Sequence, residues 1–554
     1  MPTNKRKRAR KACNPCHQRK RKCDGEYPCG TCSTYQYQCR YDDDITTGTA
    51  DPPVAKLAVL EGRNMQVQPP VENEGSPSTG KSPGIFEEQK SRYTGASAAM
   101  AFPHILGLAL GSNNPPKINS TAYNFGIRPE EASNAYGLLG NLISEDNLAF
   151  YSGVYFSAMG SIGDVIDPRI YAQRCYEYYH GPGSPPVAFG AIAAGIAAVG
   201  SFLSSVRYSR ESELLQYAKA ILDDPASMRI LSVDHIIAWG MRLFYLRATT
   251  RRSSSAWVAS CTLMHHCEVV GLHKEENIQR IASVAGAATS LGHDADRLRR
   301  IFWILWAGHQ MLSYECDRSA VIFTAVTTLA ISTIPGSIAD QFVKIIQIIP
   351  SPNSPFQLDS QPLSPREELS ERLTALNKLR FTHPFLVATK ADLAFCFYRR
   401  IYQLNAGIAD ETIQVVIDIG RDGLEAAEQL ASQGRLLWNV IGSVFQYACI
   451  LLAIDTPASS AHIPTAFKTL ENLARATDTT LTRQALSIAR HLLSLNIAKK
   501  RKELLQLEAV EAGYEAFQTP EPEPNTVPDL VGWGVDWDQF LVEPDLSMFP
   551  DMQM

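Results

Sequence analysis

Six cysteines near the start of the chain constrain its fold more than any other feature. Their spacing is C-x2-C-x6-C-x5-C-x2-C-x6-C, so one C-x2-C-x6-C pattern occurs twice. Thiolates in paired C-x2-C units are characteristic ligands of structural zinc. Zinc takes four ligands, so six thiolates fill two ions only when two of them bridge. Because every position would then be occupied, the sequence predicts a structural rather than a catalytic cluster. The cysteines are Cys13, Cys16, Cys23, Cys29, Cys32 and Cys39.

The residues around these cysteines are strongly basic. Residues 1–41 contain eleven Lys or Arg against two acids, whereas the whole chain has a formal net charge of -5. A positive surface attracts phosphate groups, and its binding weakens with salt. The basic run at 5–11 also suits a nuclear localisation signal, with a solvated tail as the alternative. The candidate DNA-contacting residues are Lys5, Arg6, Lys7, Arg8, Arg19, Lys20, Arg21 and Lys22.

Residues 12–40 resemble the fungal zinc binuclear cluster DNA-binding domain. The matching text is ACNPC at 12–16, RKRKCDG at 19–25 and PCGTC at 28–32. The resemblance implies two zinc ions bridged by Cys13 and Cys29. It also implies that Lys20 reads a CGG-type triplet of double-stranded DNA in the major groove. A lysine that donates to guanine O6 and N7 is chemically suited to that reading.

Two other interpretations of the cysteines are weaker. A disulfide framework would suit a secreted chain, but residues 1–11 are polar and basic rather than a hydrophobic leader. A zinc ribbon that contacts protein or RNA fits the spacing and the basic run less closely. The other six cysteines are scattered among apolar residues and are expected to be buried thiols in a reducing compartment.

Composition divides the chain into four predicted segments. They are the zinc module at 1–41, a disordered linker at 42–92, an all-helical regulatory domain at 93–507 and an acidic tail at 508–554. The linker is rich in Pro, Gly and Ser. Within it, Val54, Leu57 and Leu60 provide barely one and a half heptads, which is short for a coiled coil. A homodimer therefore remains an open alternative to a monomer.

The body of the chain carries helix signals rather than strand signals. Ser144 is expected to begin an amphipathic helix, and Ser364 followed by Pro365 a second one that ends near Leu379. An apolar helix is expected at 437–454. The apolar stretch at 187–203 is short and rich in Ala and Gly, so we expect a buried helix rather than a membrane span. The segment 350–364 is expected to be an exposed insertion.

The body also resembles the middle homology region of the same fungal regulators. The likeness lies in residues 256–275 and in RRIFW at 299–303, and it implies a helical regulatory domain. Cys261, His265, His266, Cys267 and His273 lie within the first stretch, where a packed helix is favoured over a second metal site. Similarly, a solvated helix end is favoured over an anion-binding site for Arg247, Arg251 and Arg252.

The tail combines acids with spaced apolar residues. Residues 511–554 contain ten acids and no Lys or Arg. Such a segment stays soluble while offering apolar groups that dock into a coactivator groove. The alternative is an acidic tail without a partner. The candidate activation residues are Trp533, Trp537, Phe540 and Leu541.

Together these features predict a nuclear, sequence-specific regulator of RNA polymerase II transcription, with an activator favoured. A repressor is the alternative within this class, and a zinc-dependent protein-interaction scaffold is the alternative from another class. No catalytic triad, P-loop or dinucleotide-binding motif argues for an enzyme. Residues 92–103 and 127–130 are similar to regulators of plant-polysaccharide breakdown, which implies carbohydrate-utilisation targets. Control of a secondary-metabolite cluster is the alternative.

Overall fold

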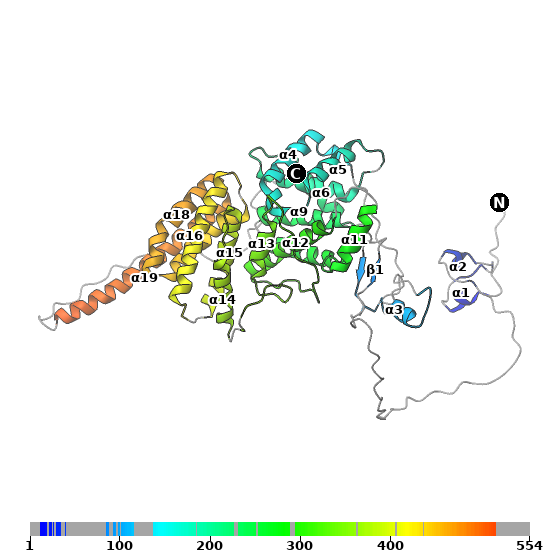
Figure 1. The fold of residues 1–554 in the computed structure, drawn as a ribbon. Helices are drawn as coiled ribbons and strands as arrows, with labels where there is room; N and C mark the ends of the chain where they lie inside the picture. Colours follow the sequence, from blue (N-terminus) through cyan, green and yellow to red (C-terminus); the bar gives the residue numbers. More distant parts are fainter. Residues whose placement is uncertain are drawn as a thin grey trace, which may run out of the picture. The chain divides into compact units, whose positions relative to one another are not determined.

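The computed structural model describes most of the chain between residues 12 and 516. The described residues are 12–18, 22–24, 26, 29–34, 39, 85–87, 92–95, 98–99, 101–115, 137–183, 185–225, 231–250, 253–287, 294–359, 361, 364–404, 407–435 and 437–516. They form two units that divide between Thr79 and Gly80. The first unit contains the six cysteines and two short helices, and the second is almost entirely helical (Figure 1). The predicted fold class, a small zinc module followed by a large all-helical domain, is confirmed.

The first part of the second unit is a group of packed helices, here called the first bundle. Its members are α4 (Glu145–Gly163), α5 (Pro168–His180), α6 (Val187–Leu203), α7 (Glu211–Leu222), α9 (Val233–Thr249), α10 (Ser253–Val270), α11 (Glu275–Ala287) and α12 (Ala295–Glu315). A 3-10 turn, η2 (Leu139–Asn141), precedes it. The helix α6 lies at its centre, against α4, α7 and α9.

The composition of α6 explains its central position. It carries no charged residue, and residues 189–201 are all buried. A helix that is apolar on every side avoids water only inside a core. Small residues let its neighbours approach closely: a Cβ added at Gly200 would lie 1.9 Å from the carbonyl oxygen of Tyr151 in α4. The predicted buried helix at 187–203 is therefore confirmed. Among the described residues, no helix is both long enough and apolar enough to cross a membrane.

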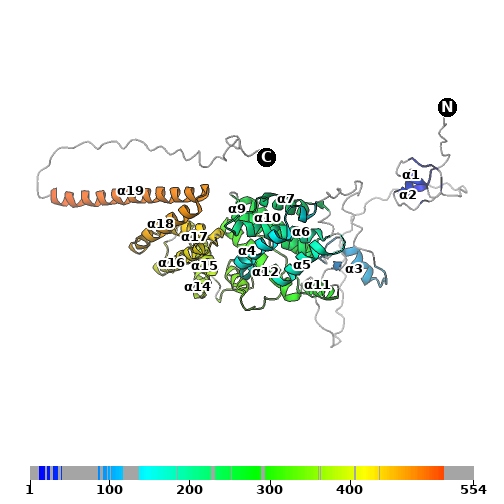
Figure 2. The same cartoon turned by 90° about the horizontal axis from the view of Figure 1, so that it is seen from above.

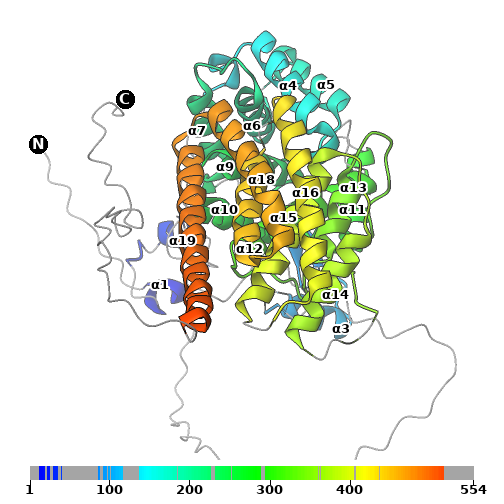
Figure 3. The same ribbon diagram turned by 90° about the vertical axis from the view of Figure 1, so that its left-hand side faces the viewer.

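The second part of this unit is another group of helices, here called the second bundle. Its members are α14 (Pro365–Lys378), α15 (Pro384–Gln403), α16 (Asp410–Ser432), α17 (Trp438–Ile454), α18 (Pro457–Thr477) and α19 (Thr480–Ala516). Figure 3 shows α15, α16, α18 and α19 running side by side. The last half of α19 extends beyond its neighbours (Figure 2), and its described side chains from Ala498 onward are exposed.

An extended segment at 316–338 and the short helix α13 (Ala339–Gln347) connect the two bundles. Side chains of the first bundle hold this segment by its backbone. His309 Nε2 accepts a hydrogen bond from the Val321 N–H at 2.8 Å, and the Trp303 indole N–H donates to the Leu329 carbonyl at 2.8 Å. The helix α13 then packs against α4, α12 and α15. One continuous hydrophobic core runs through both bundles.

The second unit begins with a small hairpin that the sequence analysis did not predict. Strand β1 (Ile85–Glu87) pairs antiparallel with β2 (Arg92–Thr94), with Phe86 opposite Tyr93. The strand β1 lies inside the segment assigned to the linker. Three residues are too few for alternation to be recognised in a sequence. A contact distant in sequence accompanies the hairpin, since the Tyr93 ring packs edge-on to His273. The helix α3 (Phe102–Ala109) follows.

The two helix starts that were predicted from capping residues are confirmed. Ser144 caps α4 by accepting from the Asn147 N–H at 3.4 Å, and Ser364 caps α14 by accepting from the Glu367 N–H at 3.3 Å. The apolar helix expected at 437–454 is α17. The predicted start of the tail at 508 falls inside α19, which continues to Ala516.

One prediction from the body holds only in part, and a second is wrong. The described residues of 350–364 are mostly exposed or half-buried, as expected, but Asn353 is buried and exchanges two hydrogen bonds of 2.8 Å with the backbone of Phe323. Arg247 was expected at a solvated helix end, but its side chain is only 10% exposed. It pairs with Glu315 at 2.6 Å. Both residues find partners that are distant in sequence, which local polarity does not reveal. Arg251 and Arg252 lie outside the described residues.

Candidate metal centre and nucleic-acid interface

Two short helices give the repeated cysteine spacing a repeated local fold. The helix α1 (Asn14–Gln18) carries Cys16, and α2 (Gly30–Thr34) carries Cys32. Each helix follows directly on a cysteine whose carbonyl oxygen accepts a backbone hydrogen bond from four residues later. These bonds run from His17 to Cys13 at 2.9 Å and from Ser33 to Cys29 at 2.8 Å. One helical turn therefore brings both thiols of each C-x2-C unit to the same side.

The four thiols of these units form a compact buried group. The Sγ–Sγ distances are 3.5 Å between Cys13 and Cys32 and 3.6 Å from Cys29 to both Cys13 and Cys16. A covalent disulfide would need about 2.0 Å, and all six cysteines are free. A tetrahedron with zinc–sulfur bonds of about 2.3 Å has edges of about 3.8 Å. The sulfur spacing therefore fits a shared zinc centre and excludes a disulfide framework.

Cys29 belongs to more than one group of candidate ligands. With Cys13, Cys16 and Cys32 it forms a set whose sulfurs lie within 4.8 Å of one another, and it forms a second set with Cys23 and Asp24. The backbone N–H of Cys29 also donates to Cys39 Sγ at 3.3 Å. A sulfur at the centre of both groups is suited to bridge two metal ions. The structure thus brings together the six cysteines that the sequence analysis selected.

Asp24 has a structural role that the sequence analysis missed. Its carboxylate accepts backbone hydrogen bonds from Glu26 at 3.1 Å and from Gly30 at 2.7 Å, which lowers its pKa. The second bond holds the start of α2. A Cβ added at Gly30 would lie 2.8 Å from the Asp24 carboxylate, so glycine permits this close approach. The sequence signal for this contact was an acid directly after Cys23 and a glycine directly after Cys29.

One described basic residue borders the cluster. Lys22 is exposed, and its backbone carbonyl accepts a hydrogen bond from Thr31 Oγ1 at 2.7 Å. This bond ties the end of the basic run to α2. The other candidate DNA contacts lie outside the described residues, as do the four candidate activation residues. They are Lys5, Arg6, Lys7, Arg8, Arg19, Lys20 and Arg21, and Trp533, Trp537, Phe540 and Leu541.

The His residues of α10 and of the turn after it lie against different neighbours. The ring of His266 lies 5.6 Å from Trp239, and the ring of His273 stacks on Phe323 at 5.3 Å. His265 is exposed and faces Glu268. In the described part of the chain, groups of three or more possible metal ligands with closely spaced donor atoms occur only in the first unit. Burial lowers the pKa of both His266 and His273 to about 4, so these rings pack as neutral aromatic groups.

Comparisons with known proteins agree with this geometry. Residues 11–47 match the profile of the fungal Zn(2)-Cys(6) binuclear cluster domain. The chain is 37% identical to "Protein RDR1" of Saccharomyces cerevisiae, over 99% of this chain and 98% of that protein. It is 30% identical to "Transcription factor kojR" of Aspergillus oryzae, over 91% of this chain and 86% of that protein. "Probable transcriptional repressor C1348.12" of Schizosaccharomyces pombe is 23% identical, over 78% and 93%.

These relatives align with the helical body as well as with the cysteine module, so the similarity is not confined to a shared metal-binding motif. The profile match, the buried thiols and the sulfur spacing all indicate one binuclear zinc cluster, which is structural rather than catalytic. The chain belongs to the family of fungal Zn(2)-Cys(6) binuclear cluster transcription factors.

Proposed function

We propose that this protein is a nuclear, sequence-specific regulator of RNA polymerase II transcription that binds CGG-type triplets in double-stranded DNA. The observation that carries the proposal is a group of closely spaced thiols, built around two short helices, whose flanking sequence is strongly basic. The cluster replaces a hydrophobic core, because so short a segment buries little apolar surface. Its role in this proposal is to give the module a fixed fold, from which the basic residues at 19–22 contact the major groove.

The proposal assigns different roles to two groups of basic residues. Lys20 reads the base edges of the triplet, whereas the basic run at 5–8 contacts phosphates and strengthens binding to any sequence. Contacts with phosphates release counterions, so they set the salt dependence of binding rather than its specificity.

Replacement of Lys20 tests this assignment. Lys20→Ala is expected to weaken binding to a CGG-containing duplex by about 1–3 kcal/mol, because it removes the hydrogen bonds to guanine. Binding to a duplex without the triplet should change little, so the preference between the two should nearly disappear. Fluorescence anisotropy with both duplexes at several salt concentrations measures both quantities.

The matched control is Lys5→Ala. It should weaken binding to both duplexes alike and make the slope of log affinity against log salt less steep by about one unit. If Lys20→Ala weakened binding to both duplexes equally, the assignment of Lys20 to base reading would be wrong.

We favour an activator because of the acidic, aromatic tail, whose ten acids oppose collapse while Trp and Phe supply docking energy. A repressor is the second candidate, because a relative that aligns with 78% of the chain is named a probable transcriptional repressor. Tethering the tail to an unrelated DNA-binding domain distinguishes them. The segment to tether is 517–554, because it begins after the last residue of α19.

The tethered tail is expected to raise reporter expression. Triple replacement of Trp533, Trp537 and Phe540 by Ala should abolish this activity, since the aromatic groups supply the apolar contact. Replacement of Asp536 and Asp538 by Asn should only reduce the reporter expression, because long-range electrostatic attraction mainly sets the rate at which the tail meets its partner. A silent tail, or a triple variant with full activity, would favour the repressor.

Two further points separate the remaining alternatives. DNA binding that is lost on chelation argues against a protein-interaction scaffold, since a scaffold needs zinc but not DNA.

We propose carbohydrate-utilisation genes as targets, with a secondary-metabolite cluster as the alternative. Mapping of genomic binding sites in the presence and absence of the protein tests this choice directly.

A further inference from the structure

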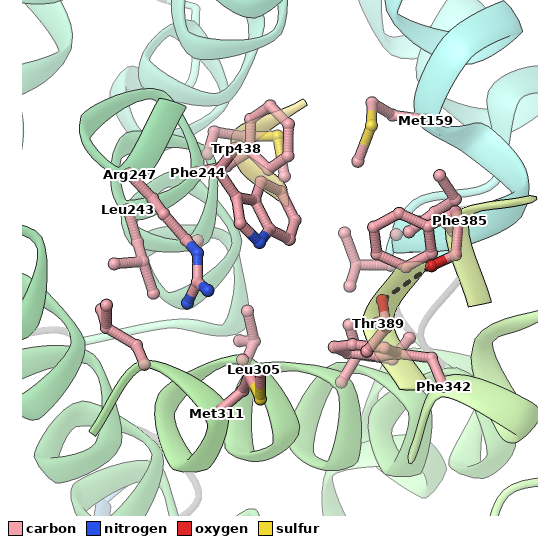
Figure 4. Close-up of a pocket in the computed structure, with 18 of the residues that line it drawn as sticks. Met159, Leu243, Phe244, Arg247, Leu305, Met311, Phe342, Phe385, Thr389 and Trp438 are labelled. Atoms are coloured by element: carbon pink, nitrogen blue, oxygen red, sulfur yellow. Dashed lines mark hydrogen bonds between the residues drawn. The ribbon is translucent and has the colours of Figure 1, made fainter. Parts of the chain in front are cut away.

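A cavity of about 110 Å³ lies where the two bundles meet. Its walls come from α4, α9 and α12 on one side and from α13, α15 and α17 on the other. Figure 4 shows Phe244, Phe385 and Trp438 around the space, together with Met159 and Met311. Aromatic rings and flexible thioethers are the side chains that adapt best to an apolar ligand. The lining is therefore chemically suited to binding rather than merely imperfectly packed.

The size of the cavity limits the occupant. An engineered protein cavity of about 150 Å³ lined by aliphatic and aromatic side chains binds benzene. A volume of 110 Å³ is slightly smaller, so it holds the body of one six-membered ring once the thioethers adjust. Gly308 of α12 lines this space, and a Cβ added there would meet no atom within 4 Å. The space next to Gly308 is thus free of side chains.

The apolar lining of the cavity is interrupted by polar side chains. Two of them, Arg247 and Thr389, lie on opposite sides of the space in Figure 4. The guanidinium of Arg247 lies 4.8 Å from the centre of the Trp438 ring, and its Nη2 donates to Glu315 at 2.6 Å. A guanidinium has five N–H donors, so others remain for a ligand. Thr389 Oγ1 donates to the Phe385 carbonyl at 2.8 Å and keeps its acceptor capacity.

The charged groups near the cavity already have partners. The carboxylate of Glu315 pairs with Arg247. Asp392 also lines the cavity, and Ser443 donates a hydrogen bond to it. Burial raises the pKa of Asp392 well above its usual value, which disfavours its charged form. An anion would have to compete with Glu315 for Arg247, and a cation would have to compete with Ser443 for Asp392. The lining therefore favours a neutral hydrogen-bonding group over an ion.

We propose that this cavity binds a small neutral molecule. Its body is apolar and about the size of one ring, and one hydroxyl or carbonyl oxygen accepts a hydrogen bond from Arg247. The molecule would contact helices of both bundles at once, so its binding would stabilise their packing against each other. The site lies within the helical unit and does not depend on the DNA-binding role proposed for the zinc module.

Three probes of similar size test the chemical class on the zinc-loaded full-length protein. They are p-cresol, which is neutral with one hydroxyl, toluene, which lacks a polar group, and benzoate, which is an anion. We expect p-cresol to bind with a dissociation constant on the order of 1 mM, as befits so few atoms. Toluene should bind several-fold more weakly, and benzoate more weakly still. Ligand-observed NMR gives the constants, and the thermal midpoint should rise with the concentration of p-cresol.

Variants then locate the binding. Gly308→Leu places a side chain in the empty space and should weaken p-cresol binding at least tenfold. Gly308→Ala should weaken it less, and it serves if the larger side chain disturbs folding. Gly153→Leu is the matched control: Gly153 lies in α4, an added Cβ there also meets no atom within 4 Å, and it does not line the cavity. It should leave the affinity unchanged.

Arg247→Met tests the polar contact. Because it removes the donors but keeps an apolar stem, it should reduce the affinity for p-cresol to that for toluene. The proposed site would be wrong if p-cresol did not bind, or if its affinity were unchanged in both Gly308 variants. Tighter binding of benzoate than of p-cresol would overturn the neutral ligand class.

Discussion

Cys29→Ser is expected to abolish zinc binding by the cysteine module, its folding and its binding to DNA together. Cys29 is fully buried and belongs to both groups of candidate metal ligands. If it bridges, its loss removes one bond from each of two ions. Structural zinc contributes about 10–16 kcal/mol to the folding of small domains, and the module has little else to stabilise it, because its core consists mainly of the cysteines themselves. Cys13→Ser should be equally severe if Cys13 is the second bridging thiol, as the resemblance to the zinc binuclear cluster domain implies.

Replacement of an outer ligand provides the comparison. Cys39→Ser removes one ligand from a single ion, so it should leave part of the zinc bound. Cys449→Ser is the control outside the module: this half-buried thiol lies in α17, and its loss should change neither zinc content nor DNA binding. Metal analysis, proteolysis and DNA-binding titrations are made on the same samples. A module that holds only one zinc, or that stays folded in excess chelator, would contradict the bridged cluster.

The features predicted correctly from the sequence are those that depend on local chemistry. The cysteine spacing defines the metal site because one helical turn places both thiols of a C-x2-C unit on one side. Ser144 and Ser364 mark helix starts because their hydroxyl groups accept hydrogen bonds from residues only three positions away. The apolar character of residues 189–201 requires burial whatever the neighbours are.

The features that were missed depend on partners far along the chain. Nothing near Arg247 in sequence indicates that its guanidinium pairs with Glu315 and lies against the Trp438 ring. The backbone of Phe323 holds Asn353 in the same way, across thirty residues. The cavity is a further example, since its walls come from five helices of the two bundles and from the connecting helix α13. Local polarity cannot distinguish such a buried polar group from a solvated one.

A buried charge network in the first bundle illustrates the same limit. Asp164 ends α4, with φ of 31°, and its carboxylate accepts hydrogen bonds from Arg297 at 2.8 Å and from Arg300 at 2.9 Å. The side chain of Arg300 is fully buried and also contacts Asp296 at 3.0 Å. Ser337, just before α13, donates to Asp164 at 2.8 Å. One carboxylate thus joins α4, α12 and the segment that leads to the second bundle.

Asp164→Ala is therefore expected to destabilise the helical unit by about 3–5 kcal/mol. The loss leaves the nearly buried guanidinium of Arg297 without its Asp164 carboxylate and the buried guanidinium of Arg300 with Asp296 alone. A buried charge that loses its partner costs more than the pair contributes. Asp164→Asn should cost less, because the amide oxygen still accepts hydrogen bonds and Asn tolerates positive φ. Urea unfolding of the full-length protein, followed by helical circular dichroism, measures the difference.

Asp478→Ala separates the charge effect from the backbone effect. Asp478 ends α18 with φ of 41° and pairs with Arg483 at 2.8 Å. In contrast to the pairs of Asp164, both side chains of this pair are exposed, Arg483 at 61% and Asp478 at 70%. An exposed pair contributes about 0–1 kcal/mol, and Ala at positive φ costs a similar amount at both sites. The excess loss in Asp164→Ala over Asp478→Ala therefore reports the buried network around Asp164, which consists of the two arginines and the Ser337 hydroxyl. Equal losses in the two variants would mean that backbone strain, and not the network around Arg300, accounts for the effect.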